Sequence, residues 1–368
     1  MANVTQIDRN LQPDAVSDGL WYFDVRKPPF RLYGLYRPRD PGPFRRCPEE
    51  VAEATNEGVR YLYTNTAGAR VRFRTDSRVV AIRAEYPSLC LKPHQAAVGS
   101  SGFDLFADGA HFNTFRPTVN YEEGRYSFSM EGGYASQIAF PDRKSREILI
   151  HFPTYNDVTS LYVGLEEDAK TQAPSDYAVS VPVVFYGSSI THGCSATKPG
   201  DAYPSVLSRW LDADILNLGF SGSARGEDVM ANYIASLSMS AFVYDYDHNA
   251  PDAEHLRKTH ERMFRIIRDA QPELPILMAS RADRNPGDQA DERREIILET
   301  YRRARDGGDR NVYFIDGADM YDLLDRSLCT VDGCHPTTLG FYCMAKAFYP
   351  TLEKILYPRG RAVRGETR

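Results

Sequence analysis

The pattern of hydrophobic and polar positions along this chain changes near Asp168 and divides it into two parts. Before that point short apolar runs recur at close intervals, and some alternate with charged residues, as in 71–75 (Val-Arg-Phe-Arg-Thr). Alternation with a period of two is typical of half-exposed strands, and turn residues such as Asp108-Gly109 separate the runs. We therefore expect an N-terminal β-sandwich of the jelly-roll type over residues 17–168. Its expected strands are Leu32–Tyr36, Val59–Tyr63, Val71–Thr75, Val79–Tyr86, Gly102–Ala107, Ile138–Phe140, Ile148–Phe152 and Leu161–Leu165.

From Val181 onward, apolar runs alternate with segments of helical periodicity. Five such strand–helix units predict a doubly wound parallel sheet with helices on both faces, which we place at 180–357. The charged tail, 358–368, is expected to be disordered. The expected strands are Val183–Tyr186, Ile215–Leu218, Ala241–Tyr246, Pro275–Ala279 and Val312–Ile315, and the expected helices are Ala202–Leu211, Glu227–Leu237, Ala253–Ala270, Asp291–Asp306 and Thr338–Leu356.

Composition and charge narrow the classes of protein. A length of 368 residues allows two domains, and the hydrophobic (42%) and charged (26%) shares are ordinary for a globular protein. A net charge of -6 argues against nucleic acid or an anionic membrane as a partner. The first residues show no signal peptide, and the six cysteines form no Cys-x-x-Cys pair, so we expect reduced thiols and a cytoplasmic protein. The oligomeric state stays open, a homo-oligomer included.

A candidate nucleophile follows the first strand of the predicted parallel sheet. The apolar run 183–186 leads directly into Gly187-Ser188-Ser189. Ligands bind at the carboxyl ends of the strands in such sheets, so a serine displayed there is well placed for chemistry. Both serines are open to this role, and the alternative is that the stretch is only a serine-rich turn.

A serine nucleophile needs a base, an orienting carboxylate and donors for the developing oxyanion. Asp332 and His335 lie three residues apart in a turn after the last strand, where Asp332 can hold His335 Nδ1 and leave Nε2 for the serine. A glycine-containing loop, 217–223, and Asn249 follow two further strands and can supply N–H donors. The acidic residues beside Asn249, Asp245 and Asp247, are interpreted as loop-capping groups.

The order Ser, Gly, Asn and Asp-x-x-His at four strand ends resembles the SGNH (GDSL-type) hydrolases, which are esterases and acylhydrolases on a flavodoxin-like, three-layer α/β/α fold. Gly187-Ser188-Ser189 looks like the family's Gly-Asp-Ser block, with Ser188 standing in place of the aspartate. The glycine of the second block corresponds to Gly222, and the asparagine of the third block corresponds to Asn249. The residue after Asn249 is Ala250 rather than the family's aspartate.

The resemblance implies a role for each matched residue. Ser189 would attack an ester carbonyl, His335 would act as the general base, and Asp332 would orient His335. The backbone N–H groups of Ser189 and Gly222, with the Asn249 amide, would form the oxyanion hole. No metal and no cofactor are expected, because serine acyl transfer needs neither.

The first half is similar to the β domain that precedes one subgroup of these hydrolases. Gly102-Phe103-Asp104-Leu105-Phe106 is similar to the Gly-x-Asp-Leu-Tyr motif of that domain. Members of the subgroup look like carbohydrate esterases, so the resemblance implies removal of a small acyl group, acetyl above all, from a carbohydrate such as an oligosaccharide. The alternatives are a thioesterase, an arylesterase or a short-chain lipase on the same residues, or a carbohydrate-binding protein with an inactive hydrolase domain. No substrate-binding residue can be named from the sequence.

Overall fold

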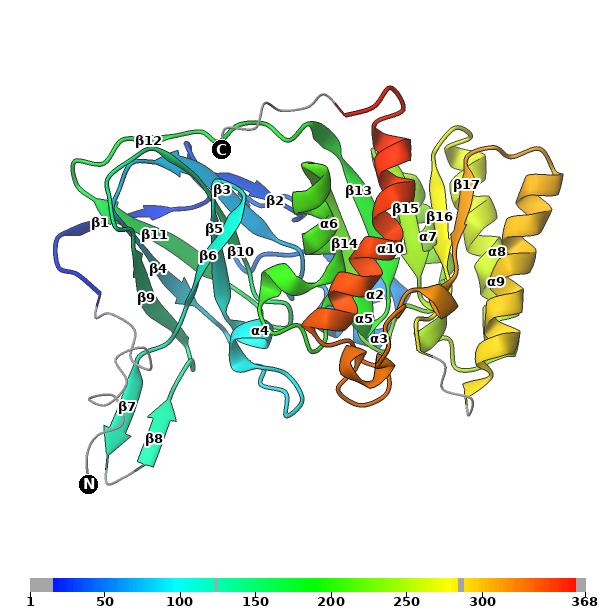
Figure 1. The fold of residues 1–368 in the computed structure, drawn as a ribbon, viewed down its shortest axis with the longest axis horizontal. Coiled ribbons are helices and arrows are strands. Elements are labelled where there is room, and N and C mark those ends of the chain that lie inside the picture. Colours follow the sequence, from blue (N-terminus) through cyan, green and yellow to red (C-terminus); the bar gives the residue numbers. More distant parts are fainter. Residues whose placement is uncertain (1–15, 123–124, 284–287, 362–368) are drawn as a thin grey trace.

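The computed structural model describes residues 16–122, 125–283 and 288–361, and it shows two sheet-built regions side by side (Figure 1). The first is built from antiparallel strands, most of them in two sheets with the orders β1-β11-β4-β9 and β12-β3-β10-β5-β6, where β2 pairs with β3. The strands β7 and β8 form a separate hairpin. Apolar side chains from both sheets fill the space between them and are fully buried, among them Phe73 and Phe103 of one sheet and Ile82 and Val163 of the other. The strands are β1 Leu20–Asp24, β2 Arg31–Tyr33, β3 Arg70–Thr75, β4 Val79–Glu85, β5 Phe103–Ala107, β6 Ala110–Phe115, β7 Val119–Glu122, β8 Arg125–Phe128, β9 Gly133–Ala139, β10 Arg146–His151, β11 Ser160–Glu166 and β12 Thr171–Gln172.

The strand predicted at Val59–Tyr63 is wrong. The segment forms α3 (Glu57–Leu62), which follows α2 (Glu49–Thr55) and precedes the short α4 (Ala97–Ser101) in the order of the chain. The Asn56 side chain caps α3 by accepting a hydrogen bond from the Val59 backbone N–H at 2.9 Å. Val59 and Leu62, three residues apart, are buried on one face, and this helical spacing outweighs the β propensity of the apolar residues.

The second region is a parallel sheet of five strands in the order β14-β13-β15-β16-β17. This order is that of flavodoxin-like folds. The predicted fold class, a three-layer α/β/α domain behind a β-sandwich, is therefore confirmed. The strands are β13 Val179–Gly187, β14 Ala213–Gly219, β15 Ala241–Asp245, β16 Ile276–Ala279 and β17 Val312–Ile315, and the helices are α5 Ser189–His192, α6 Tyr203–Leu211, α7 Asp228–Ala235, α8 Ala253–Ala270, α9 Ala290–Asp306 and α10 Thr338–Leu356.

Helices cover both faces of the parallel sheet (Figure 1). One apolar core joins the sheet to α6 and α10, and the other joins it to α7, α8 and α9. The second core also includes residues from α2 and α3, so this early helical segment packs with the parallel sheet rather than with the β-sandwich. None of the helices in the described part of the chain has the length and apolar composition that crossing a bilayer requires.

Several buried contacts join the regions, among them those of Arg46 and Asp104. Arg46, fully buried, donates hydrogen bonds to the carbonyls of Leu62 in α3 and of Asn217 and Gly219 in β14. Asp104 accepts a hydrogen bond from the Gly200 backbone N–H at 3.1 Å, and burial raises the pKa of Asp104 to about 7. A Cβ atom at position 200 would lie 2.5 Å from Asp104 Oδ2, so this contact requires glycine.

The topology determines where a site can form. The strands β14 and β15 lie on opposite sides of β13, so the chain leaves the end of β13 at the point where the strand order reverses. Crevices at such switch points are the usual ligand sites of open α/β sheets. The end of β13 carries Ser188 and Ser189. Most of the predicted tail, from residue 362 onward, lies outside the described residues.

Candidate active site

The structure brings Ser189, His335 and Asp332 together in one chain of hydrogen bonds. Ser189 is the first residue of α5, directly after β13, and its Oγ lies 3.0 Å from His335 Nε2. His335 Nδ1 lies 2.7 Å from Asp332 Oδ2. With Nδ1–H held by the carboxylate, Nε2 is left to accept the serine proton, which is the arrangement that a serine nucleophile requires.

The turn that carries Asp332 and His335 is itself held by hydrogen bonds. The second carboxylate oxygen of Asp332 accepts from the backbone N–H groups of Cys334 at 3.0 Å and His335 at 2.7 Å. Gly333 has a φ of 86°, a backbone conformation that favours glycine. Although partial burial opposes ionisation of Asp332, the hydrogen bond from His335 lowers its pKa, so the carboxylate stays charged at neutral pH.

The two serines of the β13–α5 turn have different environments. Ser188 is completely buried, and its Oγ accepts a hydrogen bond from the Ile190 backbone N–H as the N-cap of α5. Ser189 is 8% exposed and its Oγ contacts His335. A Cβ atom at Gly187 would lie 2.1 Å from Thr191 Oγ1, so only glycine permits this tight turn. The geometry therefore favours Ser189 over Ser188 as the nucleophile.

Gly222 and Asn249 lie on loops that contact each other. The Asn249 side-chain amide donates a hydrogen bond to the Phe220 carbonyl at 2.9 Å, two residues before Gly222. Among the described residues, the backbone N–H groups of Ser189 and Gly222 have no hydrogen-bond acceptor. Donors of an oxyanion hole must be free in this way before substrate binds. Their role as oxyanion donors, with the second N–H of Asn249, stays a prediction.

A buried ionic cluster lies beneath Asn249. The preceding residue, His248, places Nε2 2.5 Å from Asp283 Oδ1 and Nδ1 3.3 Å from Asp247 Oδ1. Burial disfavours the imidazolium, but the two carboxylates outweigh it and raise the pKa of His248 well above its usual value. Asp247 also accepts from the Arg281 backbone N–H. The loop that carries Asn249 is thus held rigidly, in line with a capping role for Asp247.

The β-sandwich contributes a wall of the site. The ring of Tyr155 stacks on His192 of α5 with ring centroids 4.1 Å apart, and the Tyr155 hydroxyl lies 3.5 Å from the Ser189 carbonyl oxygen. His192 Nε2 bonds the Thr154 carbonyl at 2.8 Å, and Nδ1 accepts from the Ser221 backbone N–H at 3.4 Å. Burial lowers the pKa of His192 well below its usual value, so His192 is a neutral packing residue that positions the Gly222 loop.

Two further residues beside the candidate triad could not be found from the sequence. The Cys194 thiol lies 3.2 Å from His94 Nε2 and also hydrogen-bonds His335. His94 belongs to the loop between β4 and α4, so it reaches the site from the other region of the fold. No spacing in the sequence could reveal the pair, because 100 positions separate the two residues.

The thiol changes the protonation of the candidate base. The hydrogen bond to Cys194 is the main cause that raises the pKa of His335, to about 9, and Asp332 adds to it. Burial opposes ionisation of Cys194, yet the bonds to His335 and His94 outweigh it and lower the pKa of the thiol to about 7. At neutral pH, His335 is therefore shared between the Ser189 hydroxyl and a partly ionised thiol.

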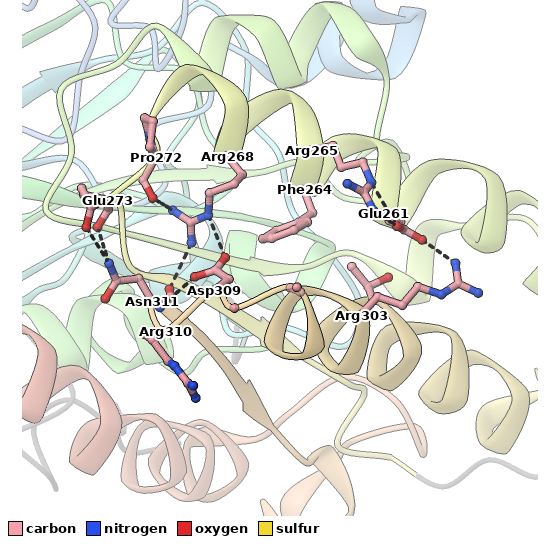
Figure 2. Close-up of a pocket in the computed structure, with 14 residues that line it drawn as sticks. Glu261, Phe264, Arg265, Arg268, Pro272, Glu273, Arg303, Asp309, Arg310 and Asn311 are labelled. Carbon is pink, nitrogen blue, oxygen red and sulfur yellow. Dashed lines mark hydrogen bonds and ion pairs between the residues drawn. The ribbon is translucent and has the colours of Figure 1, made fainter.

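A cavity of about 560 Å³ lies away from these residues, between the last turns of α8 and α9 (Figure 2). Arg265, Arg268 and Arg303 in its lining are already paired with acidic residues, as Figure 2 shows for Arg268 with Asp309 and for Arg303 with Glu261. The residues that line it include no serine, cysteine or histidine. It offers no nucleophile or base for acyl transfer.

Comparison with known proteins agrees with this geometry. Residues 180–353 match the profile of the GDSL-like lipase/acylhydrolase family, and residues 20–171 match the GxDLY family, described as the N-terminus of SGNH-hydrolase-type esterases. The chain belongs to the SGNH (GDSL-type) hydrolases. A comparison with curated protein sequences gave no match.

Solved structures resemble this SGNH hydrolase over most of its length. A Bacteroides ovatus protein described as a GDSL-like lipase is 26% identical, with a TM-score of 0.76 over 92% of this chain and 98% of its own. The salicylyl-acyltransferase SsfX3 from a tetracycline biosynthetic pathway is 20% identical (TM-score 0.72; 90% and 96% covered). An acetyl xylan esterase, Est2A, from the rumen bacterium Butyrivibrio proteoclasticus is 13% identical (TM-score 0.56; 92% and 98% covered). The last two likenesses concern the fold alone.

Because the pKa of His335 is raised, we expect the activity of this SGNH hydrolase to begin to fall with decreasing pH while the solution is still alkaline. The titratable groups that face His335 are Asp332, Cys194, Cys334 and His94. A base must be neutral to accept a proton, so kcat/KM should fall roughly tenfold per pH unit below about pH 9. In the Cys194→Ser variant the introduced hydroxyl does not ionise. The pH below which kcat/KM falls should therefore move down toward the usual histidine pKa. The measurement is the pH profile of p-nitrophenyl acetate hydrolysis, with a chelator present, for the unaltered protein and for Cys194→Ser. Coincident profiles of the two proteins would contradict this account.

Asn249 gives a test of the oxyanion donors. Asn249→Ala removes a candidate donor, so kcat should fall by about 10²–10³-fold, whereas the midpoint of chemical denaturation should change little, since about 1 kcal/mol accompanies one lost hydrogen bond. Asn232→Ala is the matched control, because Asn232 also donates its amide to a backbone carbonyl, that of Asp228, but on the exposed surface of α7. Equal kinetic effects of the two substitutions would refute the donor role.

Proposed function

We propose that this chain is a serine esterase that removes a small acyl group, acetyl above all, from carbohydrates such as oligosaccharides. The observation that carries the proposal is the continuous hydrogen-bond chain from Ser189 Oγ through His335 to Asp332 at the switch point of the sheet. Membership of the SGNH hydrolases supports the reaction class. The architecture that the chain shares with an acetyl xylan esterase supports the fold in which the reaction would take place.

The proposed reaction has two halves. Ser189 Oγ attacks the acyl carbonyl while its proton passes to His335 Nε2, and Asp332 stabilises the imidazolium that forms. The oxyanion is held by the N–H groups of Ser189, Gly222 and Asn249. His335 then gives the proton to the leaving sugar oxygen. In the second half His335 takes a proton from water as the water oxygen attacks the acyl-enzyme, and it returns that proton to Ser189 Oγ as the free acid leaves.

The surroundings of the nucleophile favour a small acyl group. Ser189 is only 8% exposed, and the buried side chains of Tyr155 and Cys194 lie close to it. Long-chain esters would need an apolar channel at this position. None of the described cavities contains Ser189 in its lining.

A groove beside the Gly222 loop favours a polar, ring-shaped alcohol. It measures about 800 Å³ and lies between α3 and the loop that carries Ser223 and Arg225. Tyr61, which is 78% exposed, stands at its wall together with Arg60. An exposed aromatic ring among polar groups can stack against the apolar face of a sugar, whereas a lipid chain would gain little from the charged residues.

The other reactions remain outcomes of the assay. A thioesterase, an arylesterase or a short-chain lipase could use the same three residues, whereas an inactive, carbohydrate-binding protein would have no need of the hydrogen-bond chain at Ser189. A location in the cytoplasm belongs to the same proposal, since all six cysteines are free thiols, as a reducing compartment favours.

The direct assay measures p-nitrophenol released from p-nitrophenyl acetate and acetate released from acetylated manno- and xylo-oligosaccharides, the latter read by mass spectrometry. Ser189→Ala should lower the rate by at least about 10³-fold. Ser188→Ala should keep most of the activity and lose about 1 kcal/mol of stability, since Ser188 is an N-cap. Turnover of neither substrate by the unaltered protein would refute the esterase proposal, and faster turnover of long-chain acyl esters would favour a lipase.

We expect substitution of Tyr61 to change KM for one kind of substrate and not for the other. Tyr61→Ala should raise KM for acetylated oligosaccharides about fivefold, because one aromatic platform contributes roughly 1 kcal/mol, and should leave p-nitrophenyl acetate kinetics unchanged. Tyr61→Phe keeps the ring and should behave like the unaltered protein. A change in KM of the same size for both substrates would show that the groove does not bind the sugar.

A further inference from the structure

Three side chains beside the nucleophile present ligand atoms for a metal ion. They are His94, Cys194 and His335, and one ligand atom of each lies within 4.8 Å of the others. They come from three separate segments: the loop between β4 and α4, the residues after α5, and the loop before α10. Two imidazoles and one thiol form a donor set that Zn²⁺ favours.

The distances between the ligand atoms are compatible with a zinc ion. Bond lengths of about 2.3 Å to sulfur and 2.1 Å to nitrogen, at a tetrahedral angle, separate the two ligand atoms by about 3.6 Å. The observed separation of Cys194 Sγ and His94 Nε2 is 3.2 Å. The rings of His94 and His335 are 5.5 Å apart at their centroids. Small side-chain movements would therefore place all three atoms around one ion.

We propose that His94, Cys194 and His335 form a binding site for Zn²⁺ that inhibits the enzyme. On binding, the Cys194 thiol loses its proton to solvent, and its sulfur forms a bond to zinc. The lone pair of His335 Nε2, which faces the Ser189 hydroxyl, is taken up by the metal. Three protein ligands leave the fourth tetrahedral position to water. The metal thus removes the proton acceptor from the candidate nucleophile.

The exposure of the three residues and their places in the fold support reversible binding of the metal. His94 is exposed and His335 is partly exposed, so an ion can approach from solvent, while Cys194, at 2% exposure, closes the site from inside. Because His94 belongs to the β-sandwich region and the other two ligands to the α/β region, bound zinc would also join the two. We therefore expect zinc to raise the melting temperature as well as to slow the reaction.

A second cluster with a thiol and an imidazole lies nearby, but its ligand atoms are already engaged with one another. His248, Asp283 and Cys334 also place ligand atoms within 4.8 Å of one another. However, His248 Nε2 already bonds Asp283 at 2.5 Å, and its Nδ1 faces Asp247. A metal there would have to break a buried ion pair, whereas in the described part of the chain His94 Nε2 has only the Cys194 thiol as its partner.

Binding to the whole protein, freed of metal by chelation, tests the site without relying on activity. Isothermal titration with ZnCl₂ should give one site with a micromolar or lower Kd, and Co²⁺ in its place should give a thiolate-to-metal absorption band in the near ultraviolet. His94→Gln and Cys194→Ser should each weaken Zn²⁺ binding at least tenfold, and Cys194→Ser should abolish the band. Cys90→Ser, a partly exposed thiol in the same loop as His94, should change neither.

Inhibition supplies an independent measurement. Micromolar Zn²⁺ should lower p-nitrophenyl acetate hydrolysis, EDTA should restore it, and each variant's loss is expressed relative to its own metal-free rate. Persistence of the cobalt band in Cys194→Ser, or equal zinc affinity in the unaltered protein and in His94→Gln, would overturn the proposal. His94 is on the surface, so its variant tests the site even where Cys194→Ser fails to fold. An inactive protein that still binds zinc through these residues would refute the esterase function but not the metal site.

Discussion

The hydrogen bond between Ser189 Oγ and His335 Nε2 is the interaction on which the candidate chemistry depends. It joins the first loop of the α/β region to the last, across 146 positions of the chain. Such a bond keeps its length only when both loops are rigid. Gly187 permits the tight turn before Ser189, and two backbone N–H groups fix the Asp332 carboxylate that holds His335. The parallel sheet provides the common edge on which these loops meet.

The β-sandwich takes part in the site instead of only preceding it. Tyr155 stacks on His192, which in turn holds the Ser221 backbone beside Gly222, so the position of a candidate oxyanion donor depends on a residue of the other region. His94, which also belongs to the first region, contacts Cys194. The thiol shifts the pKa of His335 and so couples the first region to the protonation of the base. The contact of Asp104 with Gly200 gives a physical reason for the Gly-x-Asp-Leu segment, since it secures the interface between the regions.

The sequence could reveal what is periodic or local. The bounds predicted for α8 and α10 agree with the structure, because each helix has a long apolar face and a side-chain cap at its start. The three candidate triad residues could be named because they lie in two short motifs, Gly-Ser-Ser at the end of β13 and Asp-x-x-His before α10. The segment 59–63 was assigned wrongly because its apolar residues favour strands, while the Asn56 cap and the burial of Val59 and Leu62 favour a helix. Contacts between the two regions, such as that of His94 with Cys194, leave no pattern in the sequence.

The central claim is that Ser189 carries the acyl group during the reaction. The most direct test is to mix the protein with p-nitrophenyl acetate, quench with acid within the first turnover, and map the acetylated peptide by mass spectrometry. The account predicts the added mass of one acetyl group on Ser189, and none on the same peptide from Ser189→Ala. Acetyl found on Ser188 or Cys194 instead, or no adduct at all during a rapid turnover, would contradict it.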